Sequence, residues 1–366
     1  MNTSPEDTVL GTTRTTNKPE AQTNVAPGQF PDDGYLHPFL GLVLAGSVYA
    51  GRRLATSFPR QGKDGSNPVK SILGRWRHPR LGRLYQHTPV PMKVPDFYYK
   101  KKSGFTGPRI SLVTPSLNQG CYLAAACESV LSQKYRGLEY IVRDGQSVDD
   151  SHSVLHRFED RITAIRIAND GGQARALNLG FAESTGEIMA WLNADDILLP
   201  GSLDYVAHFF SRRPDVDLIY SHRVLIDECG REIGRWVLPP FDGEMLRWTD
   251  YVPQETMFWR RSLWEKSGGK LDEQFTYALD WELLLRFMEH GARIRRVPRF
   301  LGGFRVHPLQ KTQANALTSG ASEIALLLEG IHGRKVSLEE VFSRTKLYFA
   351  KSTIYDALYR LGVLHA

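Results

Sequence analysis

The stretch IMAWLNADDILLPGSL, residues 188–203, contains the feature that decides the fold. An apolar run leads directly into Asn193, Asp195 and Asp196, and a Pro-Gly pair follows at 200–201. The run has the length and composition of a buried strand, so the two adjacent carboxylates lie where that strand ends. A turn needs one Asp for its local hydrogen bond to the backbone. Two carboxylates at this position therefore indicate a positively charged group nearby.

Outward from this strand, patterns typical of strands and helices alternate. Strand-like runs occupy 109–118, 138–145, 161–168 and 187–194, and helical runs occupy 122–133, 149–160, 172–185 and 200–214. Short connections between alternating elements predict a parallel sheet covered by helices on both faces. Ligands of such open sheets bind outside the carboxyl ends of the strands. Asp144 ends the second strand, so we expect it at the same edge as Asp195 and Asp196.

The sequence beyond residue 215 is less regular. Runs at 216–227 and 232–240 suggest antiparallel strands, 279–291 an amphipathic helix closed by Gly291, and 293–307 a pair of short strands. Two further helices are expected at 315–332 and 337–364. We therefore predict one α/β domain at 109–312, followed by a C-terminal helical extension at 313–366.

The N-terminal third has a different composition. Residues 1–34 are rich in Thr, Asn, Pro, Asp and Gly, which predicts a disordered tail. Residues 35–108 begin with an apolar run at 37–50, shorter than the roughly 20 residues that span a bilayer. The polar residues before it argue against a signal peptide. The run is compatible with a helix in a membrane interface and with a helix packed on the main domain.

Charge is unevenly distributed along the chain, whose formal net charge is +6. Residues 51–110 contain 14 Lys and Arg against Asp64 and Asp96, which is +12, so the rest of the chain sums to −6. Such a basic arm could bind nucleic acid, anionic lipid or an acidic acceptor, and is equally compatible with a solvated, loosely ordered segment.

The cysteines bear on the compartment. Cys121, Cys127 and Cys229 are odd in number and have neither CxxC nor metal-ligand spacing. A disulfide framework is therefore not expected, and a reducing compartment is favoured. We predict a cytoplasmic protein, with peripheral attachment at the inner face of the membrane as an option through residues 37–110.

Three carboxylates at one sheet edge repel one another unless a cation or hydrogen-bond donors compensate. A hard cation such as Mg²⁺ or Mn²⁺ takes oxygen ligands and bridges carboxylates to the phosphates of a substrate. The residues thus suggest a divalent metal held by Asp195, with Asp196, that carries a diphosphate. An N-cap role for either aspartate, on the helix that begins near Pro200, fits the pattern equally well. No Walker loop or GxGxxG fingerprint is present, which argues against P-loop and nicotinamide chemistry.

Two longer stretches make the pattern specific. TPSLNQGCYLAAACESVLSQKYRGLEYIVRDGQSVDDS (114–151) and GQARALNLGFAESTGEIMAWLNADDILLPGSL (172–203) resemble the nucleotide-diphospho-sugar glycosyltransferases of family 2. The resemblance runs from about Arg109 to about Thr312. It implies a GT-A-type, Rossmann-like fold, with a mostly parallel central sheet flanked by helices. It also implies a metal-dependent inverting transferase that moves a sugar from a UDP- or dTDP-sugar to an acceptor hydroxyl, in polysaccharide, lipid-linked or cell-envelope glycan synthesis.

The resemblance assigns roles at the donor end. It places Pro115, Ser116 and Asp144 at the base and ribose of the nucleotide. The D-x-D element that binds metal and diphosphate is here Asn193-Ala194-Asp195, so Asp195 is the main metal candidate and Asn193 a neutral contact. Family members often carry Tyr at the position of Leu117, so an aromatic stack on the base is not implied.

Two glutamines, an asparagine and a glutamate are further candidates for contacts to the donor sugar or the acceptor. Gln173 and Asn178 lie on the segment that resembles the lining of the sugar-donor pocket, although Asn178 is equally compatible with a helix–sheet packing contact. Gln254 and Glu255, in VPQETMFW (252–259), resemble contacts to the donor sugar or the acceptor. Trp259 is expected in the core rather than on a sugar ring.

The closing loop and the base complete the implied site. In FRVHPLQKT (304–312), His307 would add a metal contact, with a structural role equally compatible, and Arg305 or Lys311 would neutralise the leaving diphosphate. An inverting transferase needs a base within hydrogen-bond reach of the acceptor hydroxyl. The resemblance places it at Asp280 in YALDWELLLRF (277–287), with Glu282 as a rival and an N-cap as the structural alternative. Burial and like charges would raise the pKa of such a base.

Other functions remain open from the sequence. Asn193 in place of an acid suggests a catalytically degenerate scaffold that binds a nucleotide-sugar without turnover. The basic arm suggests a nucleic-acid binder, but the chain carries no nucleic-acid motif, so no nucleic acid is expected as a partner. The expected partners are a nucleotide-diphospho-sugar donor and a glycan or lipid-linked acceptor.

Overall fold

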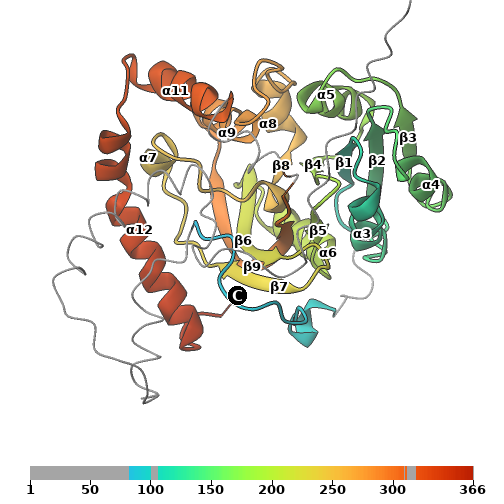
Figure 1. Ribbon diagram of the computed structural model, residues 1–366, viewed down its shortest axis with the longest axis horizontal. Coiled ribbons are helices and arrows are strands. Elements are labelled where there is room, and N and C mark those ends of the chain that lie inside the picture. The colour runs from blue at the N-terminus through green and yellow to red at the C-terminus, as the bar shows by residue number, and fades with distance from the viewer. Residues whose placement is uncertain (1–81, 100–105, 309, 311–318, 366) are drawn as a thin grey trace, which may run out of the picture. The chain divides into compact units, whose positions relative to one another are not determined.

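The structure is a computed structural model that describes residues 82–99, 106–308, 310 and 319–365, drawn in colour in Figure 1. These residues all fall in one compact unit. The tail at 1–34, the apolar run at 37–50, most of the basic arm at 51–110 and Lys311 lie outside the described residues. Within the described ranges, no helix combines the length and the apolar character needed to cross a bilayer.

The first half of the described sheet is parallel, as predicted. Its strands run in the order β3-β2-β1-β4 and pair in parallel throughout. They are β1 (Ile110–Ser116), β2 (Leu138–Asp144), β3 (Ala164–Ile167) and β4 (Ile188–Trp191). The helices between them are α3 (Gly120–Leu131), α4 (Ser151–His156) and α5 (Gln173–Glu183). All residues of β4 and all but Pro115 of β1 are buried, because helices cover both faces of these central strands.

The second half of the described sheet is mixed. The order continues as β8-β6-β9-β5, and β7 pairs with the second half of β6, beyond the residues of β6 that pair with β8. These elements are β5 (Ile197–Leu198), β6 (Leu218–Ile226), β7 (Glu232–Trp236), β8 (Phe258–Arg260) and β9 (Ile294–Arg305). Strand β8 is antiparallel to β4 and β6, whereas β9 is parallel to β6. The antiparallel pair expected from 216–227 and 232–240 is confirmed as β6 and β7.

The predicted pair of short strands at 293–307 is wrong, because this segment forms the single strand β9. Its register with β6 jumps from Ser221 opposite Val297 to His222 opposite Phe300. Pro298 lies in the jump, where a residue without an N–H interrupts the ladder least. A bulged long strand and two short strands have the same local sequence pattern.

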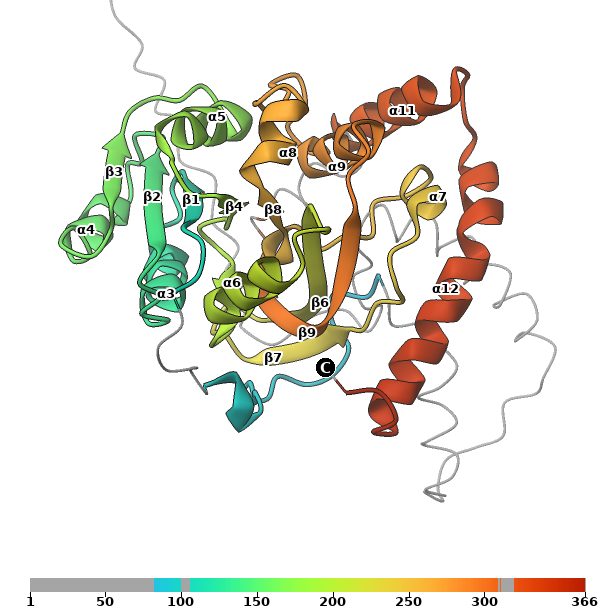
Figure 2. The ribbon, with the colours of Figure 1, turned by 180° about the vertical axis from the view of Figure 1, so that it is seen from behind.

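Of the six remaining described helices, the four near 200–214, 279–291, 315–332 and 337–364 were expected from the sequence, whereas the short ones at 243–246 and 261–266 were not. They are α6 (Ser202–Arg212), α7 (Gly243–Leu246), α8 (Arg261–Lys266), α9 (Leu279–Glu289), α11 (Ser319–His332) and α12 (Leu338–Arg360). Two short 3₁₀ helices, η1 (Asp96–Tyr98) and η2 (Gln254–Thr256), complete the described elements. In both Figure 1 and Figure 2, α11 and α12 lie on the opposite side from β3 and α4. The C-terminal helices therefore border the mixed half of the sheet.

The aromatic core holds the two halves of the sheet together. Trp259 of β8 is fully buried, as expected, and its ring lies 5.5 Å from that of Trp191 in β4. Phe181 of α5 packs edge-on against Trp259 with the ring centroids 5.7 Å apart. Such edge-to-face pairs stabilise a core beyond the area that they bury.

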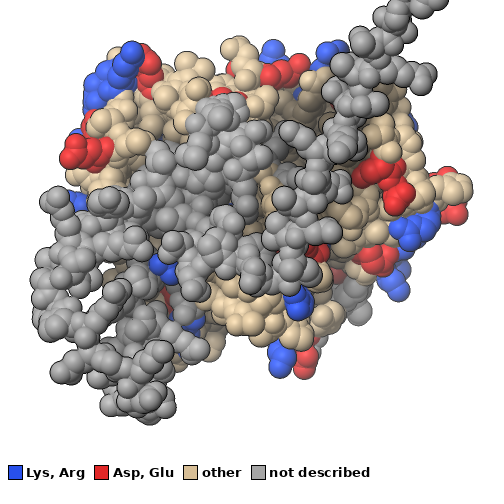
Figure 3. Space-filling view, viewed as in Figure 1, with Lys and Arg blue, Asp and Glu red and all other residues tan. Residues whose placement is uncertain are grey.

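The end of the predicted basic arm packs against β7. Gln86 donates its backbone N–H to Ile233, 2.8 Å away, and Val90 forms an isolated bridge with Glu232. Leu84 is fully buried in this contact. Where Figure 3 shows described residues, Lys and Arg lie interspersed with Asp and Glu. Exposed ion pairs such as Arg161 with Glu128 contribute little stability.

Candidate active site

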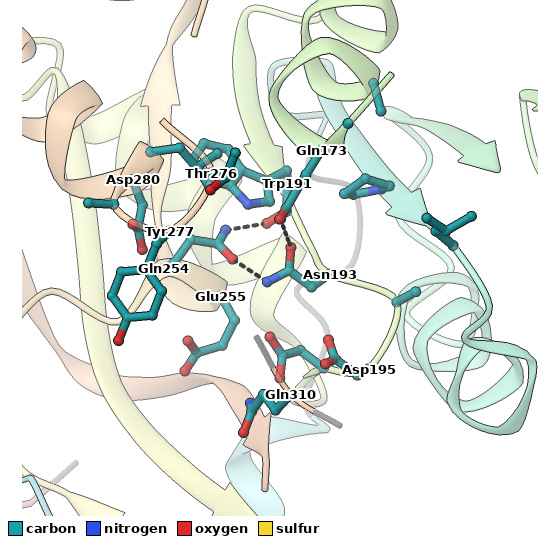
Figure 4. A pocket seen from close by; sticks show the side chains of 18 of the residues that line it. Gln173, Trp191, Asn193, Asp195, Gln254, Glu255, Thr276, Tyr277, Asp280 and Gln310 are labelled. Carbon is teal, nitrogen blue, oxygen red and sulfur yellow. Dashed lines mark hydrogen bonds between the residues drawn. The ribbon is translucent and has the colours of Figure 1, made fainter. Parts of the chain in front are cut away.

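A cavity of about 570 Å³ opens at the carboxyl ends of β1 and β4, where ligands of α/β sheets bind. One side is lined by the turn after β1, by Gly145 and by residues 169–173. The other side is lined by residues 250–252 and 276–281, with Trp236, Phe304 and Ile324. Figure 4 shows Asp280 and Tyr277 on one side, and Asp195 on the side of the parallel strands. After the roles that the family resemblance implies, we call the side lined by the turn after β1, Gly145 and residues 169–173 the nucleotide end. The side lined by residues 250–252 and 276–281 is called the acceptor end.

The turn after β1 is shaped by an asparagine in the left-handed region. Asn118 has φ 54°. Its N–H donates to Ser147 Oγ, 2.7 Å away, and its Oδ1 accepts from the N–H of Val148 at 2.9 Å. These bonds tie the turns after β1 and β2 to each other. As a result Pro115 and Ser116 line the cavity, as the sequence suggested.

Asp144 has a different role from the one expected. Its Oδ1 accepts from the N–H of Ser147 at 2.8 Å and lies 3.1 Å from Nε2 of His152, and its Oδ2 accepts from Ser147 Oγ at 2.7 Å. The carboxylate is fully buried, and Gly145 rather than Asp144 lines the cavity. In the structure Asp144 holds the turn behind the nucleotide end.

Asp170 lines the cavity although the sequence reasoning did not select it. Its Oδ1 accepts from Arg143 Nη2 at 2.6 Å, while Oδ2 is buried and has no partner among the described residues. The loop around it turns through Gly171 and Gly172, with φ of 74° and 139°. The Asn-Asp-Gly-Gly run is a recognisable turn signal, and it could have indicated a shaped loop here.

Asn193 connects two glutamines. Its Oδ1 accepts from Gln173 Nε2 at 2.8 Å, and its Nδ2 donates to Gln254 Oε1 at 3.1 Å (Figure 4). Gln254 in turn donates to the carbonyl oxygen of Trp191 at 2.9 Å. The bridge requires a donor and an acceptor on one side chain, which an amide provides and an ionised carboxylate does not. This explains physically why Asn replaces the first acid of the D-x-D element.

Asn178 lies outside the cavity lining. Its Oδ1 accepts from the N–H of Leu271 at 2.7 Å, and its Nδ2 donates to Leu271 O and Glu273 Oε1 at 3.0 and 3.1 Å. The side chain therefore joins α5 to the segment before α9. These hydrogen bonds of Asn178 correspond neither to a donor contact nor to a helix–sheet contact, the two roles considered from the sequence.

The two aspartates after β4 have different surroundings. Asp195 Oδ2 lies 3.0 Å from His307 Nε2, and Asp195 is partly exposed to the cavity. Asp196 is almost completely buried and accepts from the N–H of Arg305 at 2.9 Å. Burial, reinforced by the charge of Asp195, raises the pKa of Asp196 well above its ordinary value. Helix α6 has Gly201 at its N-cap, so neither aspartate caps it.

Arg305 is occupied by backbone oxygens. Its Nε donates to Asp195 O at 2.8 Å, and its Nη1 donates to the carbonyl oxygens of Asp227 and Glu228 at 3.0 Å. The guanidinium also lies over the ring of Tyr122, 5.0 Å from its centroid. Arg305 and His307 are both outside the cavity lining, whereas Phe304 and Gln310 of the same segment line it.

A metal would have two protein ligands at this edge. In the described part of the chain, no group of three His, Cys, Asp or Glu is placed to hold a metal. Asp195 and His307 nevertheless offer a carboxylate and an imidazole, both ligands that Mn²⁺ accepts. Nδ1 of His307 is buried and has no hydrogen-bond partner in the described part of the chain. Ions such as Mg²⁺ are often held by one or two protein groups together with phosphates and water, so the pair fits a metal completed by a diphosphate.

A buried ion pair forms the floor of the acceptor end. Arg223 donates from Nε and Nη2 to the two oxygens of Glu255, at 2.8 and 2.6 Å. The guanidinium lies 4.1 Å from the ring centroid of Phe304 and 4.9 Å from that of Trp236. Gly302 of β9 makes room, since a Cβ there would lie 2.7 Å from Glu255 Cγ. Glu255 lines the cavity as predicted, but both of its carboxylate oxygens accept hydrogen bonds from Arg223. An Arg within the apolar run of β6 was the signal that could have revealed this pair.

Asp280 lies in the first turn of α9 and lines the acceptor end. Burial raises the pKa of Asp280 to about 6, although nearby hydrogen bonds and Arg223 oppose the shift. Asp250, which the sequence did not reveal, lines the same wall. Burial, and then the charge of Asp280, raises the pKa of Asp250 well above its ordinary value. The rival Glu282 is bound to Arg286 at 2.8 and 2.9 Å and is not part of the lining.

Several polar atoms of the lining have no partner among the described residues. They are Ser116 Oγ, Asp170 Oδ2, Trp191 Nε1, Tyr277 Oη and Gln310 Oε1. Buried polar atoms in folded proteins are nearly always hydrogen-bonded. These five atoms could form hydrogen bonds with water or with a polar ligand in the cavity.

The chain resembles known proteins in sequence. Residues 111–265 match the model of glycosyl transferase family 2. O-antigen biosynthesis protein RfbC of Myxococcus xanthus is 32% identical over 200 residues, 52% of this chain and 15% of that protein. The uncharacterized glycosyltransferase alr2836 of Nostoc sp. is 36% identical over 123 residues, 32% of this chain and 38% of that protein. The chain thus spans less than two thirds of these relatives.

The fold is also found among solved structures. Residues 1–349 of S. aureus TarS, in complex with UDP-GlcNAc, superpose with a TM-score of 0.51 at 14% identity. The match covers 64% of this chain and 69% of that one. It confirms the predicted GT-A-type fold.

Proposed function

We propose that this protein, whose residues 111–265 match the model of glycosyl transferase family 2, transfers a sugar, with inversion, from a nucleotide-diphospho-sugar to an acceptor hydroxyl. The donor class is a UDP- or dTDP-sugar, and the acceptor is a glycan or a lipid-linked sugar of a polysaccharide or cell-envelope pathway. The observation that carries the proposal is a single cavity that joins the turn after β1, Asp195 and a carboxylate whose pKa is raised to about 6, Asp280.

The donor is proposed to bind with its nucleoside against Pro115 and Ser116. Asp170 Oδ2 and Ser116 Oγ provide an acceptor and a hydroxyl there without partners. The bridge of Gln173, Asn193 and Gln254 would border the donor sugar. The TarS fragment, which shares the fold, was solved with a donor of this class.

The diphosphate is proposed to lie beside Asp195 and His307. These two residues would hold Mg²⁺ or Mn²⁺, which when bound stabilises the charge of a departing diphosphate. Arg305 would act indirectly, because its guanidinium holds the backbone of Asp195 and of residues 227–228.

Asp280 is proposed as the base that removes the proton of the acceptor hydroxyl. A base works best when its pKa is near the working pH, and the raised pKa of Asp280 serves this purpose at neutral pH. Asp250 shares this wall, where burial and then the charge of Asp280 raise its pKa. Binding both substrates in one cavity supplies the orientation on which such a transfer depends.

The test measures binding and turnover separately. Calorimetry with UDP, dTDP and GDP, with and without Mn²⁺, is expected to show one diphosphate that binds with metal and that Asp195→Ala does not bind. Asp280→Asn is expected to bind it as wild type does but to release diphosphate from the matching nucleotide-sugar about 10³-fold more slowly. Binding without any turnover by wild type would support the scaffold function instead, and no binding at all would overturn the proposal.

A further inference from the structure

Glu323 of α11 lies outside the residues matched by the family and makes an unusual set of contacts with the acceptor end. Its carboxylate accepts from the N–H of Tyr277 at 2.8 Å and of Ala278 at 2.9 Å. The N–H of Thr276 lies 3.1 Å from both oxygens, and the Thr276 hydroxyl donates at 2.7 Å. Three successive backbone amides and a hydroxyl therefore converge on one carboxylate. These three residues line the cavity immediately before Asp280 and its helix.

This contact takes the place of a local helix cap. Helix α9 begins at Leu279, and its N-cap, Ala278, has no side-chain cap. Amides at the start of a helix attract an anion, and hydrogen bonds to an ionised carboxylate are stronger than those between neutral groups. Partial burial opposes ionisation of Glu323, but the hydrogen bonds from Ala278 and Thr276 outweigh it and lower its pKa. Glu323 is thus ionised at neutral pH, where its contacts are strongest.

The C-terminal helices support the acceptor end at other points. Ile324, next to Glu323, is itself part of the cavity lining. The ring of Tyr348 in α12 lies 4.6 Å from that of Tyr251, and His332 stacks on Trp248 at 4.0 Å. Both segments that carry the acids of this wall, around residues 250 and 280, are therefore backed by α11 or α12.

We propose that Glu323 is a positioning residue, which fixes the loop at 276–278 so that Tyr277 and Asp280 face the acceptor. The C-terminal extension would then complete the active site rather than only stabilise the domain. This inference rests on the proposed role of Asp280 as the base. A displacement of about 1 Å in such a group can reduce turnover by about 10²-fold. Loss of the carboxylate would release three amides at once, which makes a shift of this size the expected result.

The first measurement is amide hydrogen exchange on the full chain. Glu323→Ala is expected to speed exchange at residues 276–278 by at least about tenfold, while amides of β1 and β4 keep their protection. Glu323→Gln, which retains one acceptor oxygen, should fall between that variant and wild type. The control is Glu329→Ala, an exposed glutamate of the same helix. Unchanged exchange at 276–278 in Glu323→Ala would overturn the inference.

The second measurement follows the release of the nucleoside diphosphate, UDP or dTDP, from UDP-glucose, UDP-GlcNAc and dTDP-glucose. Glu323→Ala should lose about 10²-fold in turnover with UDP and dTDP affinity unchanged, and Glu323→Asp should recover part of the loss. Opening the loop to water would also move the pH midpoint of the rate below about 6, the pKa of Asp280 in the intact wall. A variant that is only less stable would keep that midpoint.

Asp280→Asn separates the two hypotheses. If Asp280→Asn keeps its turnover, or if wild type releases diphosphate from none of the three donors, the proposed function fails and the positioning role fails with it. If Asp280→Asn loses turnover while Glu323→Ala behaves as wild type, only the positioning role is wrong.

Discussion

The nucleotide end and the acceptor end of the cavity are built in different ways. The nucleotide end uses turns that directly follow β1, β2 and β4, and bonds such as that of Asn118 to Ser147 join neighbouring turns. The acceptor end assembles Arg223, Asp250, Asp280 and Glu323 from segments spread over a hundred residues. It also concentrates carboxylates around one buried arginine. Changes at the first end should therefore act on donor binding, and changes at the second on stability and turnover.

The largest effect, on the free energy of unfolding, is expected when the buried ion pair of the acceptor end is removed. Arg223→Met leaves Glu255 as a buried, unpaired charge, which costs roughly 3–5 kcal/mol in the free energy of unfolding. Urea denaturation measures this loss. The double variant Arg223→Met/Glu255→Met removes both charges and should recover most of it. Equal destabilisation of the single and double variants would show that packing on Trp236 and Phe304, rather than charge, dominates.

A second effect concerns pH at the same wall. The pKa of Asp280 is raised to about 6 from an ordinary 3.8, so its neutral form favours the fold. That contribution is present below about pH 4 and lost as the pH rises through about 6. Asp280→Asn should therefore have a free energy of unfolding about 3 kcal/mol higher than wild type at pH 8 in urea denaturation, and show no such gain at pH 4. The same residue must be ionised to act as a base, so turnover should fall below about pH 6.

A third prediction tests the bridge that joins the two ends. Asn193→Asp cannot donate to Gln254 while it accepts from Gln173, so one buried bond is lost. The expected cost is about 1–3 kcal/mol in donor affinity, visible by calorimetry with the bound diphosphate. If the aspartate instead strengthens binding in Mn²⁺, the position behaves as a metal ligand rather than as a bridge. Asn193→Gln, which keeps the amide, serves as the control.

The smallest effect is expected at Asn178. Its bonds join α5 to Leu271 and do not reach the cavity. Asn178→Ala should lower the free energy of unfolding by about 1–2 kcal/mol and leave diphosphate affinity within about twofold of wild type. A tenfold loss of affinity would show that Asn178 contributes to donor binding, which would contradict the proposed difference between the two ends.

Much of the nucleotide end could be predicted because its geometry is local. The family resemblance placed Pro115, Ser116, Gln173, Asn193 and Asp195 in the donor site, and all five line the cavity. The side chains of Asp144 and Asn178 turn away from it. A sequence pattern does not predict which group a polar side chain will hydrogen-bond. Here Asp144 bonds to Ser147 and Asn178 bonds to Leu271, and both side chains therefore point away from the cavity.

The acceptor end was predicted only in part. Asp280, Gln254 and Glu255 were selected through family resemblance, whereas Asp250 and Glu323 have no local signal. Glu323 caps a helix that begins more than forty residues earlier in the chain. An N-cap from the helix's own flank is visible in sequence, but one supplied by a distant helix is not.

The sequence by itself therefore determined the alternation of strands and helices, the edge where the carboxylates meet, and the family. These depend on periodicity and turn chemistry, which act between residues close in the chain. Only the tertiary structure decided that β9 is one bulged strand, that Asn193 bridges two glutamines, and that α11 holds the loop before Asp280. These features depend on burial and hydrogen bonding between residues that are distant in the chain, and so they are settled only when the whole domain packs.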